Sequence, residues 1–287
     1  MDSVFEQEQQ HLTETYAKLE HIEHELSDAL KAGLAKALED KEAMLDELAL
    51  NPDEDVHVET MAEYEAMNRI IDAYNLSATI NAEKLHRAQL LKRQPYFAKV
   101  QLLFKQGGEP KDVYIGAAAM TDEARRHFIV DWRSPVAEVY YNQANGPTSY
   151  VADNRTIDCE LMLRRQFDIE GATLNAYFDT TVAIEDPLLL KSLSKQRSDK
   201  LQAITTTIQK EQNTVIRHED VDALLVSGIA GSGKTSVLLQ RIAYLFYRLR
   251  DTLEPKDVYL ITPNRVFSRY IDAVLPEMGE SNPRTLT

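Results

Sequence analysis

The chain has 287 residues, of which 44% are hydrophobic, and it carries one cysteine and a formal net charge of −14 at pH 7. Its length is enough for more than one packed domain, and it has neither an apolar run of 18 residues nor the start of a signal peptide, which argues against a membrane-bound or exported chain. One cysteine excludes an internal disulfide and is typical of a reducing compartment, so we expect a cytoplasmic protein. The acidity is uneven, because residues 1–95 hold 21 acidic and 9 basic residues, a balance of −12.

Residues 1–95 have the composition of long helices, with one glycine and two prolines. Their apolar residues recur at spacings of three, four and seven, which predicts one buried face on each of two helices. The first series is Leu12, Leu19, Ile22, Leu26, Leu30, Leu34 and Leu38, and the second is Tyr64, Met67, Ile71, Tyr74, Ala78 and Leu85. The polar run 51–55 predicts a turn between them, so we expect a long antiparallel helical hairpin, a coiled-coil arm that projects onto another domain or into a partner.

The turn of this hairpin carries three carboxylates, Asp53, Glu54 and Asp55. One interpretation is an ordinary solvated loop. The other is a carboxylate cluster that the arm delivers to a metal or to a basic channel in a partner. His21 and His24 lie one helical turn apart, and we interpret them as surface residues because no further ligand set accompanies them.

Residues 96–182 change to the period of two that is typical of strands, with turn signals such as Asn145-Gly146 between them. This pattern predicts a small antiparallel β domain. We expect Trp132 to anchor its core rather than to stack on a nucleic-acid base, and Cys159 to be a small buried hydrophobe rather than a reactive thiol. The expected strands lie at 97–104, 112–116, 127–132, 136–141, 148–151, 157–163 and 174–178.

Residues 183–220 return to a helical pattern, and residues 228–235 have the form G-x-x-x-x-G-K-[ST] of the phosphate-binding loop of nucleotide triphosphatases. We expect a buried strand at 223–226 before this loop and a helix at 236–245 after it. Glycines let backbone N–H groups surround a phosphate, Lys234 is expected to reach the β- and γ-phosphates, and the Thr235 hydroxyl is expected to bind Mg²⁺. The alternative is a glycine-rich turn that binds no ligand. The candidate cofactor-binding residues are Gly228, Gly231, Ser232, Gly233, Lys234, Thr235 and Ser236, with Lys234 and Thr235 also the candidate catalytic residues.

A second buried strand is predicted at 257–261, and a helix at 266–274 follows it. Strand, loop, helix, strand and helix in this order predict the start of a parallel α/β sheet with its ligand at the carboxyl ends of the strands. We therefore expect an α+β multi-domain chain with a helical arm at 1–95, a β domain at 96–182 and a partial motor domain at 183–287.

The order of Gln212, the phosphate-binding loop and Thr262-Pro263-Asn264 resembles superfamily 1 helicases of the UvrD/Rep type. The resemblance implies a RecA-like first motor domain that uses ATP and Mg²⁺. It implies that Gln212 reads adenine, whose two edges match an amide, and that Thr262, Pro263 and Asn264 contact single-stranded DNA.

The chain also resembles HelD-like proteins, which associate with bacterial RNA polymerase. The resemblance lies in the runs 208–213, 240–245 and 261–267, in Asp131-Trp132-Arg133-Ser134-Pro135 and in the N-terminal hairpin. It implies that residues 1–95 enter the secondary channel of the polymerase core and that ATP-linked movements release polymerase from nucleic acid. We expect a monomer, because the two helices of the arm pair within one chain.

No apolar strand ending in Asp-Glu follows Thr235, and the second motor domain of such helicases has no counterpart. We therefore expect an N-terminal fragment that hydrolyses little ATP by itself, because phosphoryl transfer needs Mg²⁺ ligands, a positioned water and charge stabilisation together. Two other functions are considered: a UvrD-like DNA helicase in repair or recombination, and an interaction module in which the phosphate-binding loop is only structural.

Overall fold

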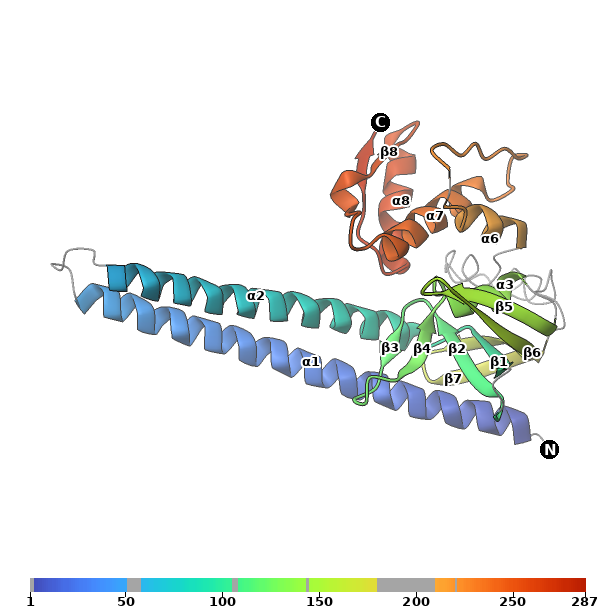
Figure 1. The fold of residues 1–287 in the computed structure, drawn as a ribbon, viewed down its shortest axis with the longest axis horizontal. Helices are drawn as coiled ribbons and strands as arrows, with labels where there is room; N and C mark the ends of the chain where they lie inside the picture. The colour runs from blue at the N-terminus through green and yellow to red at the C-terminus, as the bar shows by residue number, and fades with distance from the viewer. Residues whose placement is uncertain (1–2, 51–57, 105–107, 143–144, 180–209, 220) are drawn as a thin grey trace. The chain divides into compact units, whose positions relative to one another are not determined.

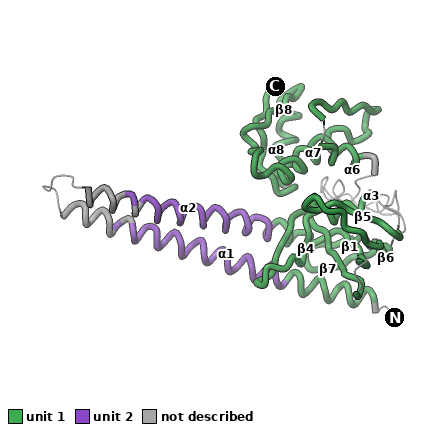
Figure 2. Tube along the Cα trace, viewed as in Figure 1, with its two compact units in different colours: residues 1–16, 90–287 green, residues 17–89 purple. Residues whose placement is uncertain are grey.

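The computed structural model describes residues 3–50, 58–104, 108–142, 145–179, 210–219 and 221–287. Contacts divide the chain into two units, Met1–Tyr16 with Leu90–Thr287, and Ala17–Gln89 (Figure 2). The chain contains a long helical hairpin, a mixed sheet and a C-terminal part in which helices and strands alternate, so the expected α+β class is confirmed (Figure 1). The division into three domains stays a prediction. Among the described residues, no helix is both long and apolar enough to cross a membrane.

The two predicted long helices are α1, Ser3–Leu50, and α2, Val58–Arg93. They run antiparallel within Ala17–Gln89, where Tyr74 donates to Asp40 at 3.1 Å and Gln89 donates to Glu23 at 3.3 Å. The carboxylates Asp53, Glu54 and Asp55 lie outside the described residues, as does the expected turn at 51–55.

The apolar face predicted on α1 is buried over only part of its length. Leu19 and Leu26 are buried, whereas Leu34 is 65% exposed and Leu38 is 53% exposed. The prediction of a continuous buried face is therefore wrong beyond Leu30. The physical reason is that a pair of helices offers each side chain only one neighbour, which cannot cover it on all sides. Ile71 on α2 is 39% exposed for the same reason.

The sheet of residues 98–179 has the order β3-β4-β2-β1-β6-β5, with β7 paired to β6 (Figure 1). It is mixed, so the prediction of a wholly antiparallel domain is wrong. The exception is β2 with β4, which run parallel with Ile115 opposite Val130. The connection between them contains β3, which pairs antiparallel with β4, so the chain reverses twice before β4 forms beside β2. The strands are β1 Ala98–Phe104, β2 Lys111–Gly116, β3 Met120–Thr121, β4 His127–Asp131, β5 Gly146–Ala152, β6 Arg155–Glu170 and β7 Thr173–Asp179.

The strand predicted at 136–141 is helical instead. A 3₁₀ turn, η1, spans Pro135–Ala137, and the short helix α3 spans Glu138–Asn142. Pro135 starts the turn, where its missing N–H is not needed and its fixed φ fits a helix. Three neighbouring side chains, Val139, Tyr140 and Tyr141, are buried. The β-branched and aromatic residues that suggested a strand thus reflect burial rather than an extended backbone.

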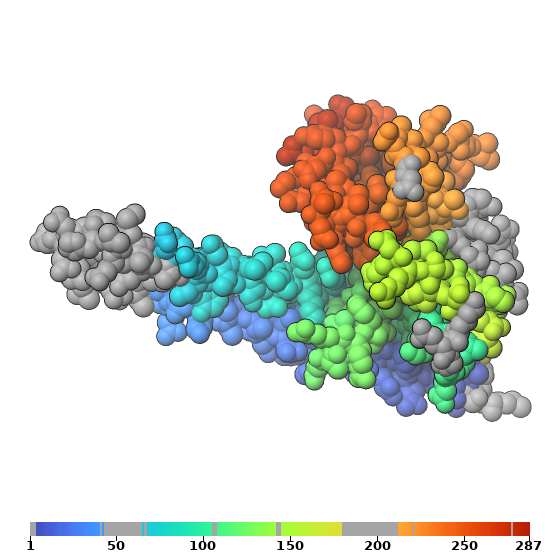
Figure 3. Space-filling view, viewed as in Figure 1, coloured from blue at the N-terminus to red at the C-terminus, as the bar shows by residue number. Residues whose placement is uncertain are grey.

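One hydrophobic core joins this sheet to the C-terminal helices. Trp132 is completely buried in it, as expected of a core anchor, and Cys159 is buried on β6. The same core includes Ile216, Leu239 and Leu275 from helices further along the chain. The described residues from α6 to the C-terminus form one lobe, mostly coloured orange to red in Figure 3.

That lobe contains α6 Lys210–Ile216, α7 Lys234–Arg248, the 3₁₀ turn η2 Pro255–Asp257, β8 Tyr259–Ile261, α8 Arg265–Glu277 and β9 Arg284–Leu286. The helices predicted at 236–245 and 266–274 are confirmed. A strand forms at 259–261, but the prediction that it is buried is wrong, because Tyr259 is 55% exposed and Ile261 is 80% exposed. The strand predicted at 223–226 is wrong, because these residues are irregular and Leu225 is 92% exposed. A strand exists only when a partner satisfies its backbone, and among the described strands β8 pairs with β9 rather than with 223–226.

Candidate nucleotide-binding site

The glycine pattern of the phosphate-binding loop is required by its backbone. Gly231 and Gly233 have φ of 82° and 83°, a left-handed conformation that side chains other than glycine adopt at a cost. A Cβ added to Gly228 would lie 2.6 Å from Ser232 Oγ. Glycine is therefore favoured at Gly231 and Gly233 by the backbone conformation and at Gly228 by the closeness of Ser232.

Helix α7 begins at Lys234, directly after the loop, with Gly233 as its N-cap. Gly233 offers no capping side chain, and the first turn contains no acidic residue. The first N–H groups of a helix have no partner within the helix, and they lie at the positive end of its dipole. Thr235 and Ser236 belong to this turn and are half-buried. The start of α7 is thus suited to an anion such as a phosphate.

The Lys234 side chain lies across the loop. Its ammonium donates to the carbonyl oxygens of Gly228 at 2.8 Å and Ile229 at 2.7 Å. An ammonium has three donors and can redirect them, because it is a compact charge on a flexible stem. Lys234 therefore places a positive charge beside the carbonyl oxygens of the loop, next to the start of α7.

Gln212 of α6 reaches the same place from another helix. Its Nε2 atom lies 3.1 Å from the position that a Cβ of Gly233 would take. A glycine at 233 is therefore needed both for its positive φ and to leave room for Gln212. The structure thus brings Gln212 beside the phosphate-binding loop, and its recognition of adenine stays a prediction.

Thr262 and Asn264 each form a hydrogen bond with the backbone of another residue. Thr262 is buried, and its N–H donates to Leu286 O at 2.8 Å. The Asn264 side chain caps α8, accepting from Phe267 N at 3.0 Å. Pro263 and Asn264 are exposed. These partners give Thr262 and Asn264 structural roles, and their contact with nucleic acid stays a prediction.

Two polar clusters were missed by reasoning from the sequence. The first surrounds Asp131, Arg133 and Arg217, of which the first two were singled out only as part of a resemblance. Arg133 Nη2 donates to Asp131 Oδ2 at 2.7 Å, and Arg133 also bonds Glu280. Burial lowers the pKa of Arg133, but the carboxylates of Asp131 and Glu280 outweigh it and raise this pKa above its ordinary value. Arg133 therefore stays charged inside the protein.

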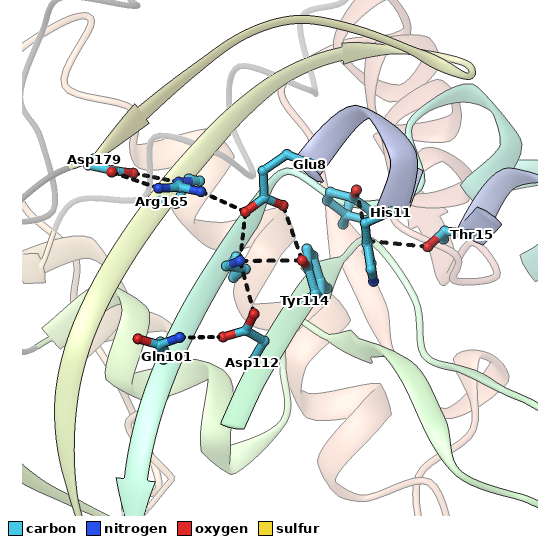
Figure 4. Close-up of polar contacts among 10 residues, drawn as sticks. Glu8, His11, Thr15, Gln101, Asp112, Tyr114, Arg165 and Asp179 are labelled. Atoms are coloured by element: carbon cyan, nitrogen blue, oxygen red, sulfur yellow. Dashed lines mark hydrogen bonds and ion pairs between the residues drawn. The ribbon is translucent and has the colours of Figure 1, made fainter. Parts of the chain in front are cut away.

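The second missed cluster surrounds Glu8, which is buried at the start of α1 (Figure 4). Its carboxylate accepts from Lys99 and Arg165 at 2.6 Å each, and from the Tyr114 hydroxyl at 3.1 Å. Burial, followed by the charge of Glu8, raises the pKa of Tyr114 and of neighbouring Tyr96 well above the ordinary value. The available sequence signal was that Glu8 lies four residues before Leu12, on the same helix face.

Comparison with known protein families gives two matches, one in the N-terminal part of the chain and one in the C-terminal part. Residues 5–192, most of the chain, match the family described as DNA helicase IV HelD, N-terminal domain. Residues 208–269 match the UvrD/REP helicase N-terminal domain, and this range includes Gln212, the phosphate-binding loop and Thr262–Asn264. A search of curated proteins found no match. The chain therefore belongs to the HelD family of UvrD/REP-type, superfamily 1 helicases.

Proposed function

We propose that residues 228–236 bind ATP with Mg²⁺ and that this chain supplies the nucleotide-binding part of an ATP-dependent helicase-like protein. The observation that carries the proposal is the loop geometry. Gly231 and Gly233 have positive φ, a Cβ at Gly228 would meet Ser232, and the Lys234 ammonium lies on the loop carbonyl oxygens directly before α7. The match of residues 208–269 to the UvrD/REP helicase N-terminal domain supports it.

The residues present fit this cofactor. Lys234 would exchange the carbonyl oxygens of Gly228 and Ile229 for oxygens of the β- and γ-phosphates. The amides from Gly231 to Ser236 would donate to the phosphates, and the Thr235 hydroxyl would bind Mg²⁺. Gln212 would pair with the adenine edge. ATP, when bound, supplies the free energy for movement, while these residues only hold and orient it.

The test is ATP binding by the chain of residues 1–287, followed with a fluorescent ATP analogue. Lys234→Ala should weaken binding by at least about tenfold, the effect of losing roughly 1.4 kcal/mol of charge-assisted hydrogen bonding. Lys256→Ala is the matched control, because Lys256 is exposed on η2 and pairs only locally with Glu254. Equal binding by the Lys234→Ala variant and the unchanged chain would favour the interaction module instead.

We further propose that the whole protein acts as HelD-like proteins do, using ATP to remodel or release RNA polymerase from nucleic acid. The support is the match of residues 5–192 to the HelD N-terminal domain. In this proposal the hairpin of residues 1–95 enters the secondary channel of the polymerase core, with Asp53, Glu54 and Asp55 at its tip. Binding of DNA belongs to the motor domain.

The tip is tested without removing the hairpin, because α1 also contributes Glu8 and Leu12 to the core of the larger unit. The variant Asp53→Asn, Glu54→Gln, Asp55→Asn removes three charges and should weaken binding to core RNA polymerase. Three exposed acidic residues of α2 form the control: Glu65→Gln, Asp72→Asn and Glu83→Gln. If both triple variants bind polymerase equally, the tip is an ordinary solvated loop.

A UvrD-like DNA helicase in repair or recombination is the second candidate, supported by the match of residues 208–269. It predicts salt-dependent binding to single-stranded DNA without affinity for polymerase. The acidity of residues 1–95 disfavours the arm as a DNA-binding surface.

A further inference from the structure

The turn Asp131–Ser134, between β4 and η1, is joined to α6 by one side chain. Arg217, directly after α6, donates to the carbonyl oxygens of Trp132 at 2.7 Å, Arg133 at 3.1 Å and Ser134 at 3.4 Å. Its Nε donates to Asn213 Oδ1 at 3.0 Å, so the guanidinium is also tied back to α6. A planar fork of five donors can hold several acceptors at once, which the single ammonium of a lysine cannot do.

The turn itself is held rigidly. Arg133 is fixed by Asp131, with its Nε donating at 2.8 Å, and its Nη1 donates to Ala243 O in α7 at 3.3 Å. It also bonds Glu280, beyond the end of α8, and its guanidinium lies 4.9 Å from the Tyr247 ring centroid. The three carbonyl oxygens that Arg217 contacts therefore belong to a turn that is anchored to α7 and to Glu280 after α8.

The described residues of α6, Lys210–Ile216, are held by contacts from outside the helix as well. Arg241 of α7 supplies another, donating to the carbonyl oxygens of Val215 at 2.8 Å and Ile216 at 3.3 Å. Gln212 lies five residues before Arg217, about 7.5 Å along a helix. The hydrogen bonds that hold the end of α6 at Arg217 therefore also hold Gln212 in place beside Gly233.

We propose that Arg217, held by the turn Asp131–Ser134, is a positioning residue that sets Gln212 for recognition of the nucleotide base. This rests on the proposed function of the phosphate-binding loop. Hydrogen bonds weaken steeply when an amide shifts or tilts, so a loosened α6 lowers base recognition while the loop keeps its hold on phosphates. The β domain thereby contributes to nucleotide selectivity although it contributes no atom that contacts the nucleotide.

The experiment compares binding of ATP, GTP and inorganic tripolyphosphate, each with Mg²⁺, to the chain of residues 1–287 and its variants. Arg217→Lys keeps the positive charge but lacks the planar guanidinium with its several donors, and Arg217→Ala removes both the charge and the donors. Gln212→Ala shows the effect of losing base recognition directly. Arg248→Ala is the matched control, because Arg248 is exposed on the neighbouring α7 and pairs with Glu219 at 3.2 Å.

We expect both Arg217 variants and Gln212→Ala to lose about tenfold in ATP affinity, equivalent to one hydrogen bond of roughly 1.4 kcal/mol. Their affinity for tripolyphosphate should equal that of the unchanged chain, and so should all affinities of Arg248→Ala. Unchanged tripolyphosphate binding also shows that the variants fold.

A purely structural role for Arg217 would lower ATP and tripolyphosphate affinity together, or neither, and either result overturns the inference. An unchanged chain that binds tripolyphosphate as tightly as ATP also overturns it, while leaving the phosphate-binding loop assigned. An unchanged chain that binds none of the three ligands overturns the proposed function and this inference with it.

Discussion

Glu8 of α1 and Lys99 of β1, which are 91 residues apart in the sequence, form a buried ion pair of 2.6 Å. Arg165 shares the carboxylate from β6, and Asp112 and Asp179 balance the two cations from the rim of the cluster (Figure 4). Helix α1 is thus attached to the sheet by charge as well as by the burial of Leu12.

Glu8→Gln should lower the free energy of unfolding by about 3 kcal/mol, because it leaves two buried cations without their shared carboxylate. Glu6→Gln, at an exposed position on the same helix, should change it by less than about 0.5 kcal/mol. Urea unfolding followed by circular dichroism measures both. Equal midpoints would mean that Asp112 and Asp179 alone balance Lys99 and Arg165.

Gly233→Ala should abolish tight ATP binding. Alanine is strained at a φ of 83°, and its Cβ would lie 3.1 Å from Gln212 Nε2. Gly33→Ala is the control within the same chain, because Gly33 is helical and a Cβ there meets nothing within 4 Å. That change should stabilise α1 by about 0.5–1 kcal/mol and leave ATP binding unchanged. Calorimetric titration and thermal unfolding of both variants test this; ATP binding retained by Gly233→Ala would contradict the proposed site.

ATP hydrolysis by residues 1–287 should be negligible even when ATP binds. The residues that follow Thr235 in this chain contain no Asp-Glu pair to complete a Mg²⁺ site, and phosphoryl transfer needs Mg²⁺ ligands as well as a phosphate-binding loop. Phosphate release over hours, with single-stranded DNA present and absent, is the measurement. Steady turnover that Lys234→Ala abolishes would show that other residues of this chain complete the catalytic site.

Asn264 can be tested for two roles at once. Asn264→Ala removes the cap of α8 and should cost about 1 kcal/mol of stability. Asn264→Asp keeps a capping oxygen and places a negative charge at a helix N-terminus, so stability should be retained. If Asn264 contacts single-stranded DNA, the added charge should weaken that binding at low salt. DNA binding that is the same in Asn264→Asp and the unchanged chain would leave Asn264 with its capping role only.

Alkaline pH should destabilise the protein partly through Tyr244. Burial, followed by its hydrogen bond to Glu219, raises the pKa of Tyr244 to about 12. Between its ordinary value near 10 and about 12, the unfolded chain loses this proton and the folded chain keeps it. The contribution of Tyr244 is therefore complete below pH 10 and is lost as the pH rises towards 12.

Tyr244→Phe should reduce this part of the alkaline loss, whereas Tyr259→Phe, at a residue that is 55% exposed, serves as the control. Unfolding midpoints at pH 9, 10 and 11 give the comparison. The same slope in both variants would exclude a contribution from Tyr244.

The sequence predicted correctly those elements whose conformation depends on residues close to one another in the chain. The glycine spacing of the phosphate-binding loop matches a backbone with positive φ at Gly231 and Gly233, and the helices expected after the loop and after the second strand are present as α7 and α8. The strand predicted at 223–226 failed because a strand depends on a partner that no local pattern supplies. The strand predicted at 136–141 was wrong because aromatic and β-branched residues also occur in a buried helix.

The polar clusters could not be predicted, because their members meet only after folding. Arg217 contacts the carbonyl of Trp132, 85 residues away in the sequence, and a backbone acceptor has no sequence signature at all. For Glu8 the sequence offers only its place four residues before Leu12, and that spacing does not reveal that Lys99, Tyr114 and Arg165 will surround its carboxylate.

Trp132 is the chain's single tryptophan, and it lies completely buried in the turn that Arg217 holds. Excitation of indole therefore reports on that turn alone, without labels and without background from the 13 tyrosines. The unmodified protein thus carries its own optical reporter of the contact between the turn after β4 and the helix that bears Gln212.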